Sequence, residues 1–314
     1  MIDWRAVGMR YFAYNYYLRN RFGGRVQKVS LDAGFTCPNV DGTVATGGCV
    51  FCDNRSFSPS RRLPRSPIAA QLEQGIRFVR RRYPKVARFL AYFQPATNTY
   101  APVERLRGLY AEALDHRDVV GLVVGTRPDC VSNEVCELLG ELAGRTYLSV
   151  EYGMQTMHDR SLEWMNRGHG HQAFVDAVER SRGRGFEIGA HVILGVPGET
   201  RSDMLATAKE LARLEVDAVK IHNLYAVKNT PLADWVESGR VTLMERDEYV
   251  ETVVDFLELL PPGCLIERTS GDAPPDYLVG PAWCLDKPAL RAAINVEFER
   301  RDTWQGKKLV GQEA

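Results

Sequence analysis

The sequence predicts an α/β protein whose parallel sheet curls into an incomplete barrel. Runs rich in β-branched and aromatic residues alternate six times with segments of helical periodicity, which is typical of β/α units around a sheet buried on both faces. A complete barrel of this kind needs about eight units. We therefore expect a partial (β/α)6 barrel, and the 45% hydrophobic content of the 314 residues is ample for its core.

The elements follow one another with recognisable start and stop signals. Asp3 is a suitable cap for an N-terminal helix over residues 4–22, and Gly23 and Gly24 end that helix. A long loop over residues 34–65 follows the first strand and has little periodicity. The barrel strands are expected at 25–33, 87–93, 119–126, 147–152, 186–194 and 218–226. Helices are expected at 66–83, 103–116, 133–143, 202–214 and 232–237. Between the strands at 147–152 and 186–194, several short helical pieces are expected, ending at residue 183.

Beyond Gly239 the pattern becomes mostly helical. Helices are expected over 244–260 and 288–301, with a short strand at 264–270 between them. We therefore divide the chain into three parts, in which the last is expected to close the open side of the barrel. These parts are an N-terminal helical extension (1–24), the partial barrel (25–239) and an α-rich C-terminal extension (240–314).

Composition excludes some classes of protein. Forty basic side chains balance forty acidic ones, so no global field attracts nucleic acid. The N-terminal sequence lacks the apolar core of a signal peptide, and no later segment is apolar enough to span a membrane, so we expect a cytoplasmic protein without a membrane partner. Seven cysteines in a reducing compartment do not favour disulfides.

Three cysteines on the long loop are the strongest functional signal. Cys37, Cys49 and Cys52 are separated by eleven and two residues. Three thiolates hold a 4Fe-4S cluster with one iron open to a substrate or cofactor, whereas a fourth thiolate would close the site. The alternative is a zinc knuckle, in which Asp53 or a distant histidine would act as the fourth ligand.

This triad, with Phe51 directly before its last cysteine, resembles the radical S-adenosylmethionine (SAM) superfamily. The gap of eleven residues is longer than the usual gap of three, but longer gaps occur in the branch related to the Elongator catalytic subunit and the oxygen-independent coproporphyrinogen dehydrogenases. Over nearly the whole chain, including the ending RRDTWQGK, the sequence resembles the bacterial YtqA/YhcC-like group of that branch. The expected fold is accordingly a partial radical SAM barrel.

The resemblance implies cofactors and chemistry. It implies a 4Fe-4S cluster on Cys37, Cys49 and Cys52, SAM at the open iron, and an electron donor of the flavodoxin or ferredoxin type. The reduced cluster would cleave SAM into methionine and a 5′-deoxyadenosyl radical that takes a hydrogen atom from the substrate. The share of the protein would be to position that substrate and to exclude water.

The resemblance also implies residues that contact SAM. Phe51 and Val196 would lie near the adenine. His191 would contact the ribose, or it would form its hydrogen bonds to protein groups inside the barrel. A glutamine and an arginine twelve positions apart contact the ribose and the methionine carboxylate in the relatives, and Gln155 and Arg167 keep that separation.

The segment after the second strand stands where the superfamily often has a Gly-Gly-Glu motif, whose backbone meets the methionine amino group. Thr97, Asn98 and Thr99 are the polar candidates for that task, and a hydrogen-bonded turn is the alternative.

Three further side chains are candidate catalytic residues. Lys220 and His222 share one face of a strand, and a buried lysine needs a substrate anion or a carboxylate as its partner. Arg127 follows the third strand in a segment that looks like an Elongator-type motif. It could hold a carboxylate or phosphate in bidentate geometry, with a surface ion pair as the alternative.

The resemblance implies tRNA as the substrate. Relatives act on the 5-substituent of wobble uridine, and the YtqA-like group is linked to the conversion of carboxymethylaminomethyl-uridine to aminomethyl-uridine. A flipped base would place its carboxylate near Arg127, Lys220 or Arg268. Basic clusters between Arg61 and Arg88 predict a phosphate-binding strip, although such a run is usually a solvated face. The alternatives are a radical SAM enzyme acting on a small metabolite or peptide, and a zinc-containing binding protein.

Overall fold

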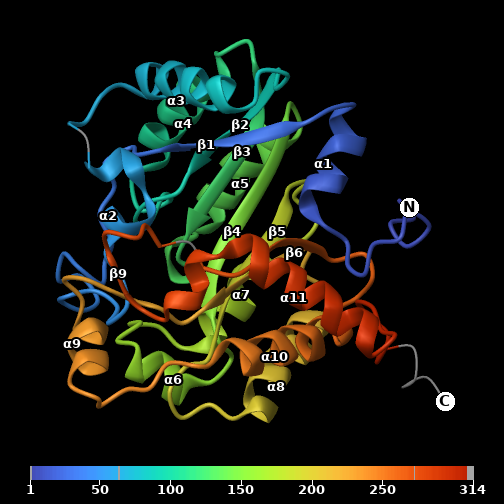
Figure 1. Cartoon of the computed structure of the whole chain (residues 1–314). Coiled ribbons are helices and arrows are strands. Elements are labelled where there is room, and N and C mark those ends of the chain that lie inside the picture. Colours follow the sequence, from blue (N-terminus) through green and yellow to red (C-terminus); the bar gives the residue numbers. More distant parts are fainter. Residues whose placement is uncertain (1, 63, 272, 310–314) are drawn as a thin grey trace.

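The computed structural model describes residues 2–62, 64–271 and 273–309, and within these ranges it contains a curled seven-stranded parallel sheet (Figure 1). Each strand pairs in parallel with its neighbours. The predicted fold class, a partial α/β barrel, is confirmed. In spatial order the strands are β1 (Val26–Leu31), β2 (Arg88–Phe93), β3 (Val119–Thr126), β4 (Tyr147–Gln155), β5 (Glu187–Leu194), β6 (Ala218–Asn223) and β8 (Leu265–Thr269).

Helices cover the outer face of this sheet and enclose the largest hydrophobic core with it (Figure 1). They form because each presents an apolar stripe toward the strands, as in α3, where Ile68, Leu72 and Ile76 are buried at helical spacing. The covering helices are α3 (Ile68–Arg82), α4 (Val103–Leu114), α5 (Asn133–Ala143), α7 (His171–Ser181), α8 (Arg201–Arg213) and α10 (Arg246–Glu258).

Shorter elements connect these units. A small antiparallel pair joins β7 (Ala226–Val227) to β9 (Leu278–Gly280). The remaining helices are α2 (Asn54–Phe57), α6 (Asp159–Trp164), α9 (Pro231–Glu237) and α11 (Lys287–Arg300), with 3-10 turns η1 (Pro59–Arg62), η2 (Pro128–Cys130) and η3 (Ala282–Leu285).

The C-terminal segment contributes a strand to the sheet. We expected six strands in the barrel, and β8 pairs with β6 and adds a seventh. A register shift in this pairing, between Val219 and Lys220 of β6, lets the consecutive residues Glu267 and Arg268 both line cavities inside the barrel.

The N-terminal helix is shorter than expected and lies at the seam between the edge strands. The helix α1 (Tyr14–Phe22) begins ten residues later than the sequence predicted, because Ala13 pairs with Ile266 and continues the edge of β8 as extended backbone. The helix contacts both β1 and β8. It therefore covers the gap that a complete barrel would have filled with strands.

The amino end of the barrel is filled by apolar side chains. Leu18 and Tyr14 of α1 pack there against inward-facing residues of the strands, including Leu90, Val123 and Leu265. The hydroxyls of Tyr14 and Tyr147 and the carboxylate of Glu187 bond one another at this end, while the larger group of polar side chains lies nearer the carboxyl ends of the strands. None of the helices in the described ranges combines the length and the apolar character that a membrane span requires.

Candidate active site

The loop that carries the three thiols follows β1 and is fixed by its own backbone. Cys49 is buried, Cys37 is half-buried and Cys52 is exposed. The amide of Cys52 donates to the carbonyl of Cys49 at 2.9 Å, and Val50 donates to the carbonyl of Met165 at 3.0 Å. These bonds attach the second half of the loop to the segment that follows α6.

Buried donors point at the sulfur of Cys49. Asn39 Nδ2 and Arg167 Nη1 both lie 3.6 Å from Cys49 Sγ. Asn39 is fully buried and also donates to the carbonyl of Asn166, whose own side chain donates to the carbonyl of Gly48 at 2.8 Å. Donors of this kind favour a thiolate over a thiol, as a metal ligand requires. The sequence analysis did not identify Asn39, which its position two residues after Cys37 would have made a reasonable candidate.

The three thiols influence one another electrostatically. Cys52 lies at the surface yet among many protein atoms, and this desolvation, followed by the charges of Cys49 and Cys37, raises the pKa of its thiol to about 12. Within the described residues, no group of three or more His, Cys, Asp or Glu side chains gathers tightly enough to hold a single metal ion. The ligands of a cubane bind different irons, so these thiols need not converge on one point.

Gln155 and Arg167 meet at Gly153. A Cβ atom placed on Gly153 would lie 2.6 Å from Arg167 Nη2 and 2.9 Å from Gln155 Nε2. Gln155 reaches this point because the register of β4 shifts between Gly153 and Gln155, where the chain adopts a left-handed φ of 72°. Arg167 Nη2 also donates to the carbonyl of Gly153 at 2.8 Å. The pair that the sequence singled out by its spacing is thus brought together, directly beside Cys49.

The segment Thr97–Thr99 ties the thiol loop to β2 and β3. The amide of Thr97 donates to the carbonyl of Thr36, while Asn98 Nδ2 donates to the carbonyls of Phe93 and Gly125. Thr99 bonds the hydroxyl of Thr126 at 2.6 Å. Two buried side-chain atoms of the segment, Thr97 Oγ1 and Asn98 Oδ1, have no protein partner and can therefore accept a hydrogen bond from a ligand.

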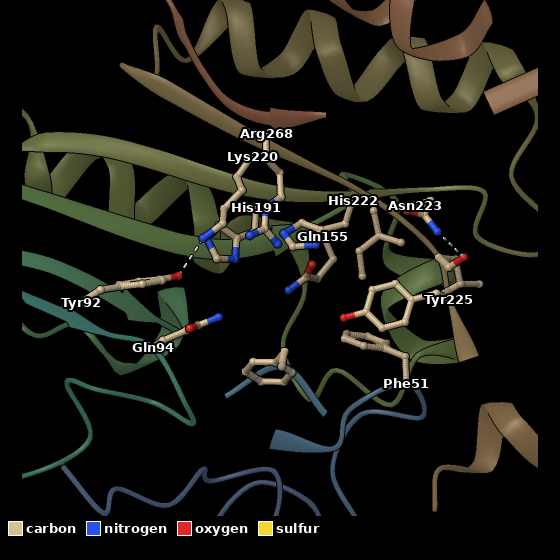
Figure 2. A pocket seen from close by; sticks show the side chains of 13 residues that line it. Phe51, Tyr92, Gln94, Gln155, His191, Lys220, His222, Asn223, Tyr225 and Arg268 are labelled. Atoms are coloured by element: carbon tan, nitrogen blue, oxygen red, sulfur yellow. Dashed lines mark hydrogen bonds between the residues drawn. The ribbon is translucent and has the colours of Figure 1, made fainter. Parts of the chain in front are cut away.

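A chamber opens inside the barrel beside the Gln155 side chain (Figure 2). Its space not filled by atoms, including open solvent at the mouth, is about 710 Å³. Phe51 from the thiol loop forms one wall, and its contact with the adenine of SAM stays a prediction. The other lining residues are Phe57, Tyr92, Gln94, Gln155, His191, Ile193, Lys220, His222, Asn223, Leu224, Tyr225 and Arg268.

Glu151 of β4 holds the floor of this chamber together. It is fully buried, and its carboxylate accepts from Lys28 at 2.6 Å, Lys220 at 2.7 Å, His191 at 2.6 Å and Tyr92 at 2.7 Å. Burial alone would raise the pKa of Glu151, but Lys220 and Lys28 hold it well below its usual range. The donors come from β1, β2, β5 and β6. One carboxylate therefore ties most of the sheet together from inside.

Lys220 has the carboxylate partner that a buried lysine needs. Besides Glu151 it donates to the Tyr92 hydroxyl at 2.7 Å, a bond drawn in Figure 2. Burial lowers the pKa of Lys220 to about 8; the carboxylate of Glu151 opposes this shift, and the positive charge of Lys28 adds to it. Lys28 also pairs with Glu267 of β8, so an ion pair crosses the open seam between the two edge strands.

The two histidines of the chamber are neutral near pH 7. Burial and then Lys220 lower the pKa of His191 to about 4. Because the carboxylate of Glu151 can only accept, His191 donates from Nε2 and its Nδ1 is left as an acceptor. Burial, then Arg268, holds the pKa of His222 well below its usual range, and the buried Nε2 atom of His222 has no protein partner. Both rings therefore offer ligands neutral nitrogen atoms.

Two predicted residues do not line the chamber. Arg127 is 2% exposed, and its guanidinium forms a bidentate pair with Asp129 at 2.8 and 2.9 Å and donates to the carbonyl of Arg167. Arg127 thereby supports the segment that carries Arg167, and its contact with a substrate carboxylate stays a prediction. Val196 packs in an apolar cluster with Phe51, and Ile193 lines the chamber wall.

The residues present fit an iron–sulfur cluster with SAM beside it. Cys37, Cys49 and Cys52 supply the thiolates, and buried donors compensate Cys49. The Nε atom of Arg167 is buried without a protein partner, as a group awaiting an anionic ligand would be. The missing side chain of Gly153 leaves the space in which Arg167 and Gln155 converge.

Comparison with protein families and known proteins gives matches over most of the chain. Residues 42–211 match the model of the radical SAM superfamily, and residues 216–300 match the model of the radical SAM C-terminal domain. The chain is 41% identical to the Bacillus subtilis (strain 168) protein YtqA, over 95% of this chain and 92% of that one.

More distant similarities cover smaller parts of the matched proteins. The chain is 27% identical to a Methanocaldococcus jannaschii protein named tRNA uridine(34) acetyltransferase, over 54% of this chain and 31% of that one. The structure of an archaeal Methanocaldococcus infernus Elp3 with an N-terminal deletion superposes with a TM-score of 0.64 at 16% identity, covering 89% of this chain and 64% of that one. At this identity the superposition shows the fold alone.

Proposed function

The chain belongs to the radical SAM superfamily, and from that membership we propose that it abstracts a hydrogen atom from the 5-substituent of a tRNA wobble uridine. The substituent we propose is carboxymethylaminomethyl. Its methylene carbon would lose one hydrogen atom and one further electron, with SAM as the net oxidant, and water would hydrolyse the resulting imine to leave aminomethyl and release glyoxylate. The superfamily uses a 4Fe-4S cluster and SAM, which together supply the radical that abstracts hydrogen. An electron donor of the flavodoxin or ferredoxin type would supply the reducing electron, and the side chains of this protein would bind and orient the substrate.

The observation that carries the proposal is the continuous contact from Cys49 through Arg167 to Gly153 and Gln155. The side chain of Arg167 connects the thiol loop to the end of β4, where Gln155 lines the chamber. Arg167 is suited to hold the carboxylate of SAM, because the N–H group at its Nε is buried and has no protein partner. Gln155 lines the chamber next to it and is suited to a ribose hydroxyl. A ligand bound by both residues would extend from the cluster into the chamber.

The composition of the chamber supports an anionic, polar substituent. Lys220 and Arg268 line the wall that also carries Gln94. A carboxylate entering here would meet the Lys220 ammonium, which already bonds the Tyr92 hydroxyl, and so would replace part of the solvation that Lys220 lost on burial. The similarity to a protein named for tRNA uridine 34 supports RNA as the carrier of that substituent.

The chain would also control proton positions around the substrate. His191 is fixed by Glu151 with its proton on Nε2, so that Nδ1 accepts a hydrogen bond from the ligand. Lys220 is a positively charged ammonium below about pH 8. The apolar residues Phe51, Ile193 and Leu224 exclude water from the same volume.

The test is SAM cleavage under anaerobic, reducing conditions with different RNAs. We expect the rate of 5′-deoxyadenosine formation to rise about tenfold or more, equivalent to 1.4 kcal/mol of barrier, with tRNA carrying carboxymethylaminomethyl-uridine relative to unmodified transcript. A rate that is indifferent to RNA but rises with a small metabolite or peptide would contradict the substrate and leave the radical SAM chemistry intact.

A further inference from the structure

We propose that the exposed C-terminal half of α3 is a docking surface for RNA, remote from the chamber. The surface, named the α3 patch, consists of Arg77, Phe78, Arg81, Arg82 and Lys85. This inference rests on the proposed function, because it takes tRNA as the substrate. It adds a second contact area and predicts which part of the RNA that area binds.

The α3 patch is one continuous face. Arg77, Phe78, Arg81 and Arg82 follow helical spacing i, i+1, i+4 and i+5 and are all exposed, and Lys85 is exposed just beyond the helix end. Within the described ranges Arg77, Arg81 and Lys85 have no ion-pair partner. The acidic residue nearest along this helix, Glu73, is already paired with His116 at 3.1 Å.

The structure divides the basic run that the sequence singled out. Its first half is used inside the protein: Arg61 pairs with Asp32, and Arg65 donates to the carbonyl of Ala33, so both fix the start of the thiol loop. Two members of the second half are also engaged, since Arg80 pairs with Asp118 and Arg88 donates to a carbonyl. The α3 patch is the part of the run that remains directed to solvent.

Phe78 distinguishes this face from an ordinary solvated helix. Its ring is 69% exposed, more than any other large hydrophobic side chain in the described ranges. An exposed aromatic ring among cations suits a nucleic acid, because a base stacks on the ring while phosphates meet the charges, and stacking contributes about 1–3 kcal/mol per base. An acidic protein segment would use the cations but would leave the ring without a partner.

Tyr83, which follows the last residue of α3, carries two cation–π contacts. The guanidinium carbon of Arg25 lies 3.8 Å and that of Arg82 lies 5.3 Å from the centroid of its ring. Arg25 precedes β1, so the basic surface continues from α3 onto the amino end of the sheet. Rigid, stacked guanidinium groups of this kind are well suited to phosphate oxygens.

The position of the α3 patch defines the size of the ligand. Helix α3 runs opposite to the strands, so its last residues lie at the amino edge of the sheet, whereas the thiol loop and the chamber lie at the carboxyl edge (Figure 1). A helix of 15 residues is about 22 Å long. An RNA that reaches both places must span that length along the outside of the barrel, as a folded stem-loop does and a nucleoside does not.

The test compares two variants of the anaerobic holoenzyme with two matched controls. Arg81→Glu is paired with Lys209→Glu on the exposed face of α8, and Phe78→Ala with Val296→Ala on α11, whose side chain is 61% exposed. The Kd for a tRNA transcript is measured over a range of salt concentrations. Turnover of the free modified nucleoside is measured in parallel.

We expect Arg81→Glu to weaken tRNA binding about tenfold and to reduce the slope of log Kd against log salt by about 1. Phe78→Ala should weaken binding about five- to tenfold without changing that slope. Both controls should bind like the parent protein, and all four variants should turn over the nucleoside equally well.

The inference is overturned if the parent protein binds the transcript and the Phe78 and Arg81 variants bind it equally tightly, whatever the RNA does to SAM cleavage. It is also overturned if polyglutamate competes as well as tRNA for the α3 patch. Failure of the proposed function has a different signature, namely transcript binding that depends on the α3 patch without any response of SAM cleavage to the modified base.

Discussion

The guanidinium of Arg167 lies against the sulfur of Cys49, with Nη1 at 3.6 Å from Sγ. The same group reaches the carbonyl of Gly153 through Nη2 at 2.8 Å, and Arg127 supports it from behind by donating to the Arg167 carbonyl. A cation fixed in this way stabilises a thiolate on one side and is directed toward an anionic ligand on the other. The site therefore depends on the space above Gly153 staying empty.

Gly153→Ala should displace Arg167 and Gln155. The added methyl group would lie 2.6 Å from Arg167 Nη2, closer than any unstrained contact allows. We expect SAM affinity to fall at least tenfold, about 1.4 kcal/mol, while iron content stays that of the parent protein. Equilibrium binding of SAM to the reconstituted protein measures this. Gly108→Ala on α4 is the matched control, because nothing lies within 4 Å of its Cβ position, and it should leave SAM affinity unchanged.

Glu151→Gln should destabilise the fold as well as the chamber. The change leaves Lys28 and Lys220 buried beside a neutral amide, and removing one partner of a buried ion pair costs about 3–5 kcal/mol. We expect the thermal unfolding midpoint of the anaerobic protein to fall by about 5–10 °C. The control Glu141→Gln breaks an exposed ion pair with Arg107, and its thermal unfolding midpoint should equal that of the parent protein. A Glu151→Gln protein as stable as its parent would show that the network is not structural.

Substrate binding should weaken as the pH rises through about 8. Burial lowers the pKa of Lys220 from 10.5 to about 8, so the folded protein loses this ammonium two to three pH units earlier than a free lysine would. The KM for the modified substrate should rise above that pH, and kcat should change less. Lys220→Arg keeps its charge over this range. A KM that rises identically in the arginine variant would exclude Lys220 as the group that binds the carboxylate.

Much of the fold and part of the site were predictable because they follow local rules. The β/α alternation fixed the strand order, and strands that run in parallel end at one edge of the sheet, so the residues after β4 and the thiol loop had to meet there. The resemblance supplied the twelve-residue spacing of Gln155 and Arg167, and the structure brings the two side chains together at Gly153. Each residue lies close in sequence to the end of one element.

What could not be predicted depends on partners far apart in the chain. In the sequence, nothing distinguishes Glu151 from other strand residues. In the structure it accepts hydrogen bonds from four side chains on four other strands, namely Lys28, Tyr92, His191 and Lys220. The same limit explains the late start of α1 and the seventh strand of the sheet. The pairing of Ala13 with Ile266 replaces helix by extended backbone, and β8 pairs with β6 although about forty residues separate them.

The central claim is that the thiol loop holds a cluster with one iron open to SAM. Iron and sulfide analysis of the anaerobic protein, with electron paramagnetic resonance of its reduced form with and without SAM, tests it most directly. We expect about four irons per chain and a spectrum that changes when SAM binds. Alanine at Cys37, Cys49 or Cys52 should abolish both signals, whereas alanine at Cys130, whose thiol lies 3.8 Å from Asp129, should preserve them. A Cys49→Ala protein with a full cluster, or a parent protein that binds zinc and no iron, would contradict the account.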